Sequence, residues 1–160
     1  MTPAFDCRRC GHCCAGEGGI VLSPGDAARL AGHLGLAVDA FLAAHAEAKG
    51  RLPRLLTGAD GYCEFYDHAL PGCGVHPARP DVCRAWPFFR GNLLDAGSWA
   101  MISEDCPGVE RGAGHAGFAA QGREYMREHG LFKPRGPETP EALVPPWPED
   151  LRSGNSGDAP

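Results

Sequence analysis

The sequence predicts a small, irregular α+β domain with short helices and a small antiparallel hairpin. Its 160 residues fit one domain. Apolar residues recur at helical spacing in several segments, and one short aromatic segment alternates in the manner of a strand before a Pro-Gly turn. The chain also contains 23 Gly and 15 Pro, so we expect its elements to be short and joined by many loops.

The first elements follow from their start and stop residues. Residues 5–19 contain too many glycines for a regular element and predict a loop rich in cysteine. Residues 20–22 are apolar and predict one short strand or a packed apolar plug. Ser23 and Pro24 are typical of a helix N-terminus, and the helical spacing that follows ends at Gly35.

The middle of the chain predicts a second helix, a hairpin and a third short helix. The second helix is expected to start at Asp39 and to end before Gly50. Residues 62–67 alternate and are aromatic, which favours a strand, and residues 73–75 would return as its partner after a Pro-Gly turn. Residues 80–86 predict a short helix, because a proline precedes it and another follows it.

The last third predicts a strand, a helix and a tail. Residues 98–103 favour a strand, and residues 115–129 favour a helix that ends at a glycine. Seven of the 15 prolines fall in residues 134–160, which contain few large apolar side chains. Such a segment buries too little surface to offset its ordering entropy, so we expect a proline-rich disordered tail after a folded domain of residues 1–133.

Charge and hydropathy argue against a nucleic-acid-binding protein and against a membrane protein. The formal net charge is −5, from 15 basic and 20 acidic residues, whereas a nucleic-acid-binding surface needs a basic excess. No apolar run reaches the length of a membrane span, and a charged residue appears already at Asp6, before any stretch of signal-peptide character. We therefore expect a cytoplasmic protein that binds neither nucleic acid nor membrane.

Eight cysteines are far more than packing requires. Four of them form a C-x2-C-x2-C-C loop, in which Gly11 lets the backbone turn so that nearby thiolates can converge on one centre. Disulfides seldom persist in the cytoplasm, so the thiols are better explained as metal ligands than as a disulfide framework. The candidate metal ligands are Cys7, Cys10, Cys13, Cys14, Cys63, Cys73, Cys83 and Cys106.

The spacing leaves the metal and the number of sites open. The remote cysteines follow one another at intervals of 10, 10 and 23 residues, none of which is the spacing of a zinc knuckle. Three close thiols with distant partners favour a 4Fe-4S iron-sulfur cluster, while zinc remains the alternative. Eight thiols suffice for one four-thiolate site or for two. Arginines within four residues of a cysteine would stabilise either negatively charged centre.

Three segments together resemble a known family. They are the C-x2-C-x2-C-C loop, the segment Gly-Tyr-Cys-Glu-Phe at residues 61–65, and the segment Cys-Gly-Val-His-Pro-Ala-Arg-Pro-Asp-Val-Cys-Arg at residues 73–84, followed by Trp-Pro-Phe. The chain is similar over residues 5–107 to the YkgJ-type cysteine-cluster family, described as a putative zinc- or iron-chelating domain. The resemblance implies a small bacterial cytoplasmic protein that uses the first seven cysteines as ligands, with Cys106 as an eighth.

Two histidines lie among these cysteines. His76 stands where the family usually has Tyr, so it is either a ring that replaces the tyrosine or an added ligand, and we expect the first. His12 lies inside the cysteine loop, and we expect it to support the ligands by hydrogen bonding and not to bind the metal itself.

Three functional hypotheses follow. The first is a metal-binding module in which an iron-sulfur cluster or zinc organises the fold. The second is an enzyme: an iron-sulfur oxidoreductase or a methylase component, since larger flagellin lysine methylases contain a similar cysteine pattern. The sequence shows neither a glycine-rich nucleotide loop nor a nucleophile with an adjacent base, so no catalytic residue is assigned. The third is a zinc-stabilised interaction domain with a protein partner.

Overall fold

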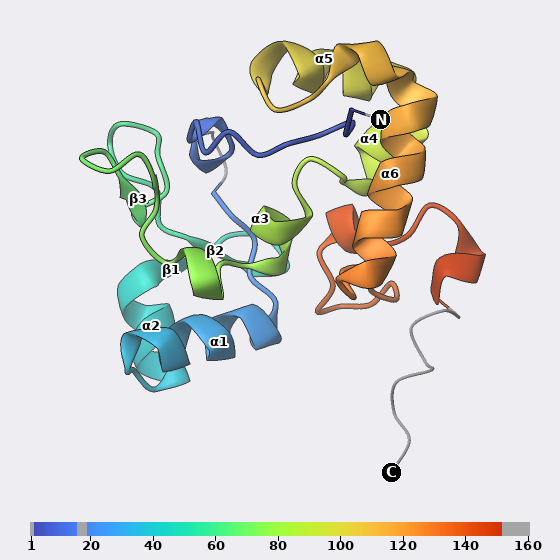
Figure 1. The fold of residues 1–160 in the computed structure, drawn as a ribbon. Helices are drawn as coiled ribbons and strands as arrows, with labels where there is room; N and C mark the ends of the chain where they lie inside the picture. The colour runs from blue at the N-terminus through green and yellow to red at the C-terminus, as the bar shows by residue number, and fades with distance from the viewer. Residues whose placement is uncertain (1, 16–18, 152–160) are drawn as a thin grey trace. The chain divides into compact units, whose positions relative to one another are not determined.

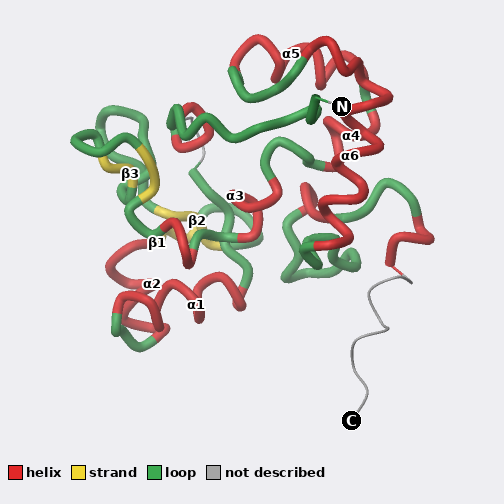
Figure 2. Tube along the Cα trace, in the orientation of Figure 1, coloured by secondary structure: helices red, strands yellow, loops and turns green. Residues whose placement is uncertain are grey.

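The computed structural model describes residues 2–15 and 19–151, and these form two compact units (Figure 1). One unit comprises residues 9–84, and we call it the cysteine unit. The other comprises residues 2–8 together with residues 85–151, and we call it the helical unit. Short helices and two antiparallel two-stranded sheets make up the described chain, which confirms the α+β class (Figure 2).

Helix α1 (Pro24–Leu34) opens the regular structure of the cysteine unit and confirms the prediction from its cap residues. The Ser23 hydroxyl accepts a hydrogen bond from the Asp26 backbone amide, while the Asp26 carboxylate accepts one from the Ser23 amide. This reciprocal pair satisfies two amides that have no partner inside the helix. The helix ends at Gly35, whose φ of 70° is a left-handed conformation that glycine adopts without strain.

Helix α2 (Val38–His45) is shorter than its apolar pattern predicts. The residues expected to continue it form strand β1 (Ala46–Ala48), which pairs antiparallel with β2 (Pro53–Leu55). Arg54 of β2 also bridges Val21, so the apolar segment 20–22 makes a single β-bridge. The sheet gives the backbone of residues 46–48 its hydrogen-bond partners on β2. The helical spacing of the local sequence does not predict this pairing.

The predicted hairpin is present but short. Strand β3 (Tyr66–Asp67) pairs antiparallel with β4 (Gly72–Cys73). The short 3-10 helix η2 (His76–Ala78) and then α3 (Asp81–Ala85) follow it, and α3 confirms the helix expected between the two prolines. Before β3, Tyr62 and Cys63 form isolated bridges to Ala15 and Thr57 and do not extend the strand.

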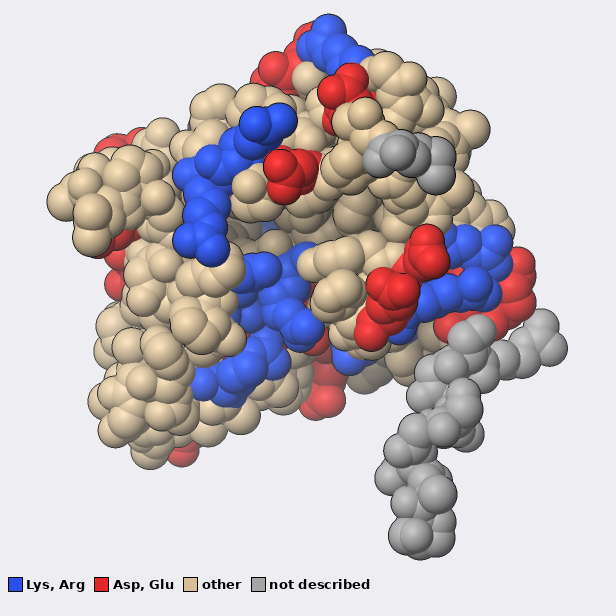
Figure 3. Space-filling view, in the orientation of Figure 1, with Lys and Arg blue, Asp and Glu red and all other residues tan. Residues whose placement is uncertain are grey.

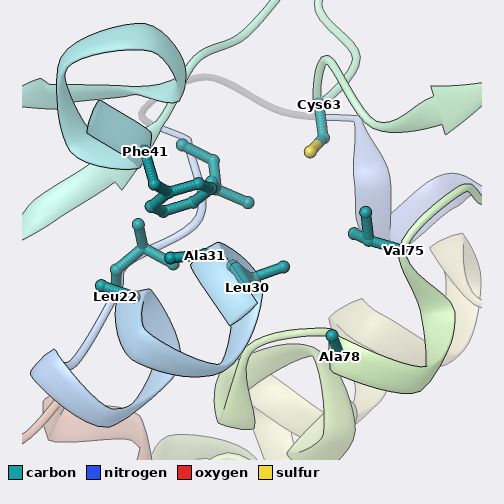
Figure 4. Packing of buried hydrophobic residues seen from close by; sticks show 9 residues of the cluster. Leu22, Leu30, Ala31, Phe41, Cys63, Val75 and Ala78 are labelled. Atoms are coloured by element: carbon teal, nitrogen blue, oxygen red, sulfur yellow. The ribbon is translucent and has the colours of Figure 1, made fainter. Parts of the chain in front are cut away.

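The core of the cysteine unit is formed by apolar side chains from the helices and from β2 (Figure 4). Leu22, Leu30 and Phe41 are completely buried, and Leu55 is nearly so. Cys63 belongs to the same buried cluster, so one of the candidate ligands is attached directly to the core. The buried members are Leu22, Ala27, Leu30, Ala31, Phe41, Leu55, Cys63, Val75 and Ala78.

The helical unit contains α4 (Arg90–Leu94), α5 (Ala96–Asp105) and α6 (Gly114–Glu128). The sequence predicts α6 but not α4 or α5. The strand expected at residues 98–103 is wrong, because Asp95 caps this segment as a helix: its carboxylate accepts a hydrogen bond of 2.7 Å from the Ser98 amide. Gly122 allows α6 to pack closely, since a Cβ there would overlap Phe88 and Leu93.

Residues 134–151 are packed onto the helical unit, in contrast to the disorder expected from their prolines. Leu143 and Val144 are buried, and the Lys133 amide donates a hydrogen bond of 2.9 Å to the Leu143 carbonyl. The Asp150 carboxylate is fully buried and lies 2.9 Å from Arg123 and 2.6 Å from Arg127. These few anchors compensate for the low apolar content; residues 152–160 lie outside the described residues.

The exposed surface is mixed in charge. Acidic and basic side chains both reach the face shown in Figure 3, and basic ones gather over the region of α3. Within the described residues, no single helix has the length and apolar character needed to cross a bilayer; α1 and α2 reach them only as a pair bent by 94°.

Candidate metal centre

The cysteine loop is shaped by one glycine and one strained residue. Gly11 has a φ of 82°, and its carbonyl accepts a hydrogen bond of 2.9 Å from the Cys14 amide, which closes the 3-10 turn η1 (His12–Cys14). Arg9, immediately before Cys10, has a φ of 51°, which is uncommon for a residue with a side chain. The turn therefore keeps Cys10, Cys13 and Cys14 on one short piece of backbone.

Backbone hydrogen bonds bring the next two cysteines to this loop. The Cys63 amide donates to the Cys14 carbonyl at 2.7 Å, and the Cys63 carbonyl accepts from the Tyr66 amide at 2.9 Å. Tyr66 is paired in register with Cys73 across the β3–β4 hairpin. Cys63 thus links the amino-terminal loop to the hairpin that contains Cys73.

Cys83 is positioned by helix α3, which is anchored to α1 at its first residue. The Asp81 amide donates a hydrogen bond of 2.9 Å to the Asp26 carboxylate, and Arg29 bridges the two acidic side chains at 2.9 and 3.2 Å. Because the Asp26 side chain is fully buried, this junction is well shielded from water. The sequence predicted α3 but gave no sign of its anchor.

Two adjacent thiols of the loop share a hydrogen bond. The Cys14 thiol donates to Cys13, which lowers the pKa of Cys13 from 9.0 to about 7; the nearby charges of Arg79 and His12 act in the same direction. The same hydrogen bond raises the pKa of Cys14, and burial and the neighbouring thiols raise it further. One thiol of the pair is therefore close to its thiolate form at neutral pH, while the other keeps its proton.

The three remote thiols have raised pKa values. Burial raises the pKa of Cys63 to about 11, and burial is also the main reason why the pKa values of Cys73 and Cys83 rise. For Cys83, the electrostatic repulsion from Cys13, Cys63 and Cys73 adds to this effect. Such repulsion requires short separations. Cys14 interacts in the same way with Cys13, Cys73 and Cys83, so these five thiols lie in one region.

Six thiols of the cysteine unit therefore form one neighbourhood, which we call the thiol cluster: Cys10, Cys13, Cys14, Cys63, Cys73 and Cys83. A cavity of about 130 Å³ is lined by Cys13, Cys14 and Cys63, with Ile20 and Leu55 among its apolar walls. In the described part of the chain no three Cys, His, Asp or Glu side chains already adopt the close spacing of a bound metal. Binding would thus require side-chain rotation that draws the thiols together.

The other two candidate ligands belong to the helical unit. Cys7 is exposed and Cys106 is buried. The chain before Cys7 pairs with the chain after Cys106, through a β-bridge between Phe5 and Val109 and a hydrogen bond of 2.9 Å from the Asp6 amide to the Gly108 carbonyl. The structure thus groups six of the eight predicted cysteines in one unit and two in the other.

His76 and Arg79 form a pair beside the thiol cluster. Arg79 Nη1 lies 3.0 Å from His76 Nδ1 and also within hydrogen-bonding distance of Nε2. Burial and the charges of Arg79 and Arg9 lower the pKa of His76, which keeps the imidazole neutral. The sequence singles out His76 and places Arg79 among the arginines within four residues of a cysteine, but it does not predict their contact.

Tyr66 is a site residue that the sequence analysis did not identify. Its ring covers Gly11 so closely that a Cβ at Gly11 would overlap it. The ring stacks on Tyr62 with centroids 4.6 Å apart, and it lies close enough to Cys14 and Cys10 to interact electrostatically. The signal for this contact in the sequence is Gly11 between the cysteines, since backbone freedom is not the only reason for a glycine there.

The donor set fits a thiophilic metal. Sulfur ligands suit zinc, copper(I) and iron-sulfur clusters, whereas calcium and magnesium need oxygen ligands. Comparison with known proteins agrees with this chemistry. No curated protein and no solved structure gave a significant match. The model of one family matches residues 6–107, which is more than half of the chain, so the protein belongs to the CxxCxxCC family, described as a putative zinc- or iron-chelating domain.

Proposed function

We propose that this protein binds an iron-sulfur cluster of the 4Fe-4S type through four thiols of the thiol cluster. The observation that carries the proposal is the convergence of three separate segments, the loop turn, the hairpin and α3, on one neighbourhood of cysteines. Family membership supports the chelation of zinc or iron.

The arrangement of the thiols favours a cluster over a single zinc ion, since three close thiols with distant partners are typical of 4Fe-4S sites. A water molecule occupies about 30 Å³ in the liquid, and the cavity of 130 Å³ beside Cys13, Cys14 and Cys63 is several times larger. When bound, the cluster would supply a redox-active centre; the chain supplies the thiolates and excludes water from one side through Ile20 and Leu55.

Metal and sulfide analysis tests the proposal. Protein purified without oxygen should contain about four iron and four acid-labile sulfide per chain and should show the broad visible absorption of a thiolate-bound cluster. Stoichiometric zinc in a colourless protein without sulfide would show that the bound metal is zinc and not an iron-sulfur cluster. A folded protein with eight titratable thiols and neither metal would refute metal binding altogether.

A matched pair of variants tests the assignment to the thiol cluster. Cys83→Ser should lose most of its bound metal, because the substitution removes a thiol from the cysteine unit. Cys106→Ser should keep its metal, since Cys106 belongs to the helical unit. Equal loss in the two variants would contradict the assignment to six thiols, and equal retention would remove Cys83 from the ligands.

A further inference from the structure

Arg79 carries a positive charge that the described residues do not neutralise with a carboxylate. Within residues 2–15 and 19–151, the ion pairs of the cysteine unit involve other arginines: Arg29 pairs with Asp26 and Asp81, and Arg84 pairs with Asp81 at 3.1 Å. Arg79 instead contacts the His76 ring and, at 3.3 Å, the His76 carbonyl. Its partners are therefore neutral groups, although it is only partly exposed.

Arg79 lies next to the buried cluster that contains thiols: it directly follows Ala78, which is buried in the same cluster as Cys63, and Cys14 and Cys73 pack against that cluster. The Arg79 charge favours the thiolate forms of Cys13, Cys73 and Cys83, which come from three different elements. Four thiolates around a zinc ion, or around an oxidised 4Fe-4S cluster, leave two net negative charges on the centre. A guanidinium close to three of these sulfurs would stabilise such a centre and oppose the mutual repulsion of the thiolates.

His76 explains why the guanidinium stays there. Arginine has only donors, so a hydrogen bond between Arg79 Nη1 and the imidazole requires an unprotonated ring nitrogen as acceptor. The Arg79 carbonyl also accepts a hydrogen bond of 2.9 Å from Arg29, which fixes the backbone at this position. Arg29 thus holds the backbone of Arg79, and His76 holds its side chain.

We propose that His76 and Arg79 act as a positioning pair, in which neutral His76 holds the Arg79 guanidinium beside the thiol cluster so that its charge stabilises an anionic metal-thiolate centre. This inference rests on the proposed metal binding. It assigns His76 a role other than metal ligand, and it separates Arg79 from Arg84, whose charge is already paired.

Cobalt(II) is the probe for the test, because its thiolate complexes absorb visibly and its affinity can be measured by competition with a chelator. Arg79→Gln should weaken cobalt binding by about 10- to 100-fold, the usual cost of losing a residue that supports metal ligands. Arg79→Lys should restore most of the affinity, because it restores the charge. Arg84→Gln is the control and should bind as the unmodified protein does.

The His76 variants test how the charge is held. His76→Phe should weaken cobalt binding while leaving the absorption spectrum and the stoichiometry unchanged, and His76→Gln, which keeps an acceptor, should be less affected. A changed spectrum in His76→Phe would make His76 a ligand and overturn the proposal.

Three further results would also overturn the positioning role. They are unchanged affinity in Arg79→Gln, equal losses in Arg79→Gln and Arg84→Gln, and failure of Arg79→Lys to restore binding. Absence of cobalt binding by the unmodified protein, together with absence of iron, sulfide and zinc after purification without oxygen, would instead refute the proposed function.

Discussion

The thiols of Cys63, Cys73 and Cys83 keep their protons well above neutral pH, since burial raises the pKa of each. Cys13, by contrast, has a pKa of about 7 and is substantially ionised before metal arrives. A metal binds thiolates, so it must displace the remaining protons. The protonation of these single residues therefore makes metal affinity depend on pH.

Metal binding should release protons. At pH 7 we expect at least about two protons per bound metal, because the remote thiols are protonated in the free protein and ionised in the complex. The sign follows directly: affinity falls as pH is lowered and rises as pH approaches the pKa values of the thiols. Calorimetric titration with zinc in buffers of different ionisation enthalpy measures the number. Binding without proton release would contradict the raised pKa values.

At the residue scale, the sequence predicted the site in part. The C-x2-C-x2-C-C spacing indicated a shared centre, because nearby thiols on a turn must lie close together. It could not group Cys63 with Cys14 or Cys83 with Cys73, since those approaches depend on backbone hydrogen bonds between distant segments. The contact between His76 and Arg79 depends on side-chain orientation, which spacing alone does not specify.

At the element scale, the junction between α1 and α3 determines where Cys83 lies. The buried Asp26 carboxylate accepts hydrogen bonds from the Ser23 amide, from Arg29 and from the Asp81 amide, each at 2.9 Å. The same carboxylate thus caps one helix and anchors the start of the other. Loss of its charge would weaken both contacts at once.

Asp26→Asn should destabilise the cysteine unit by about 2 kcal/mol, because a neutral amide accepts fewer and weaker hydrogen bonds than the buried carboxylate. Urea unfolding of the metal-loaded protein measures the change. Asp39→Asn is the control: Asp39 is exposed in the first turn of α2, and its substitution should change stability by less than about 0.5 kcal/mol. Equal effects in the two variants would argue against a special role for the junction.

Local signals predicted some elements and not others. Ser23, Pro24 and Gly35 define α1 because caps act over a few residues. The end of α2 depends on a longer-range effect, because β2 recruits residues 46–48 into a sheet. Helix α5 has a local signal, the Asp95 cap, but the β-propensity of residues 98–103 outweighed it in the prediction. The proline-rich composition of residues 134–151 likewise does not predict the few contacts that anchor this segment to the helical unit.

The order of residues 134–151 should depend on Asp150. Asp150→Asn removes the buried negative charge that Arg123 and Arg127 share, so we expect faster hydrogen exchange in the peptide covering residues 141–151. Glu141→Gln is the control, because the exposed Glu141 side chain pairs with Arg135 at 2.6 Å and with Arg90 at 3.8 Å, and such exposed pairs contribute little. Exchange that is equally fast in the unmodified protein would show that this segment behaves as the disordered tail expected from its composition.

At the scale of the whole molecule, the two units depend on different interactions. The cysteine unit has a small apolar core to which Cys63 belongs, and its loop, hairpin and α3 are joined at the thiol cluster. The helical unit packs Phe88 against Phe118, with ring centroids 5.0 Å apart, and buries Met126 and Leu131. Metal should therefore contribute folding free energy to one unit in particular.

Removal of the metal should loosen the cysteine unit selectively. Ligands that bind the folded state stabilise it by mass action, so their removal lowers the free energy of opening only for segments that the ligand ties together. After the protein is stripped of metal by a chelator, amide exchange should accelerate in peptides from residues 9–15 and 62–84. Peptides from α6 should exchange as before, because this helix packs within the helical unit. Uniform acceleration over both units would mean that they unfold together and that the metal stabilises the whole chain.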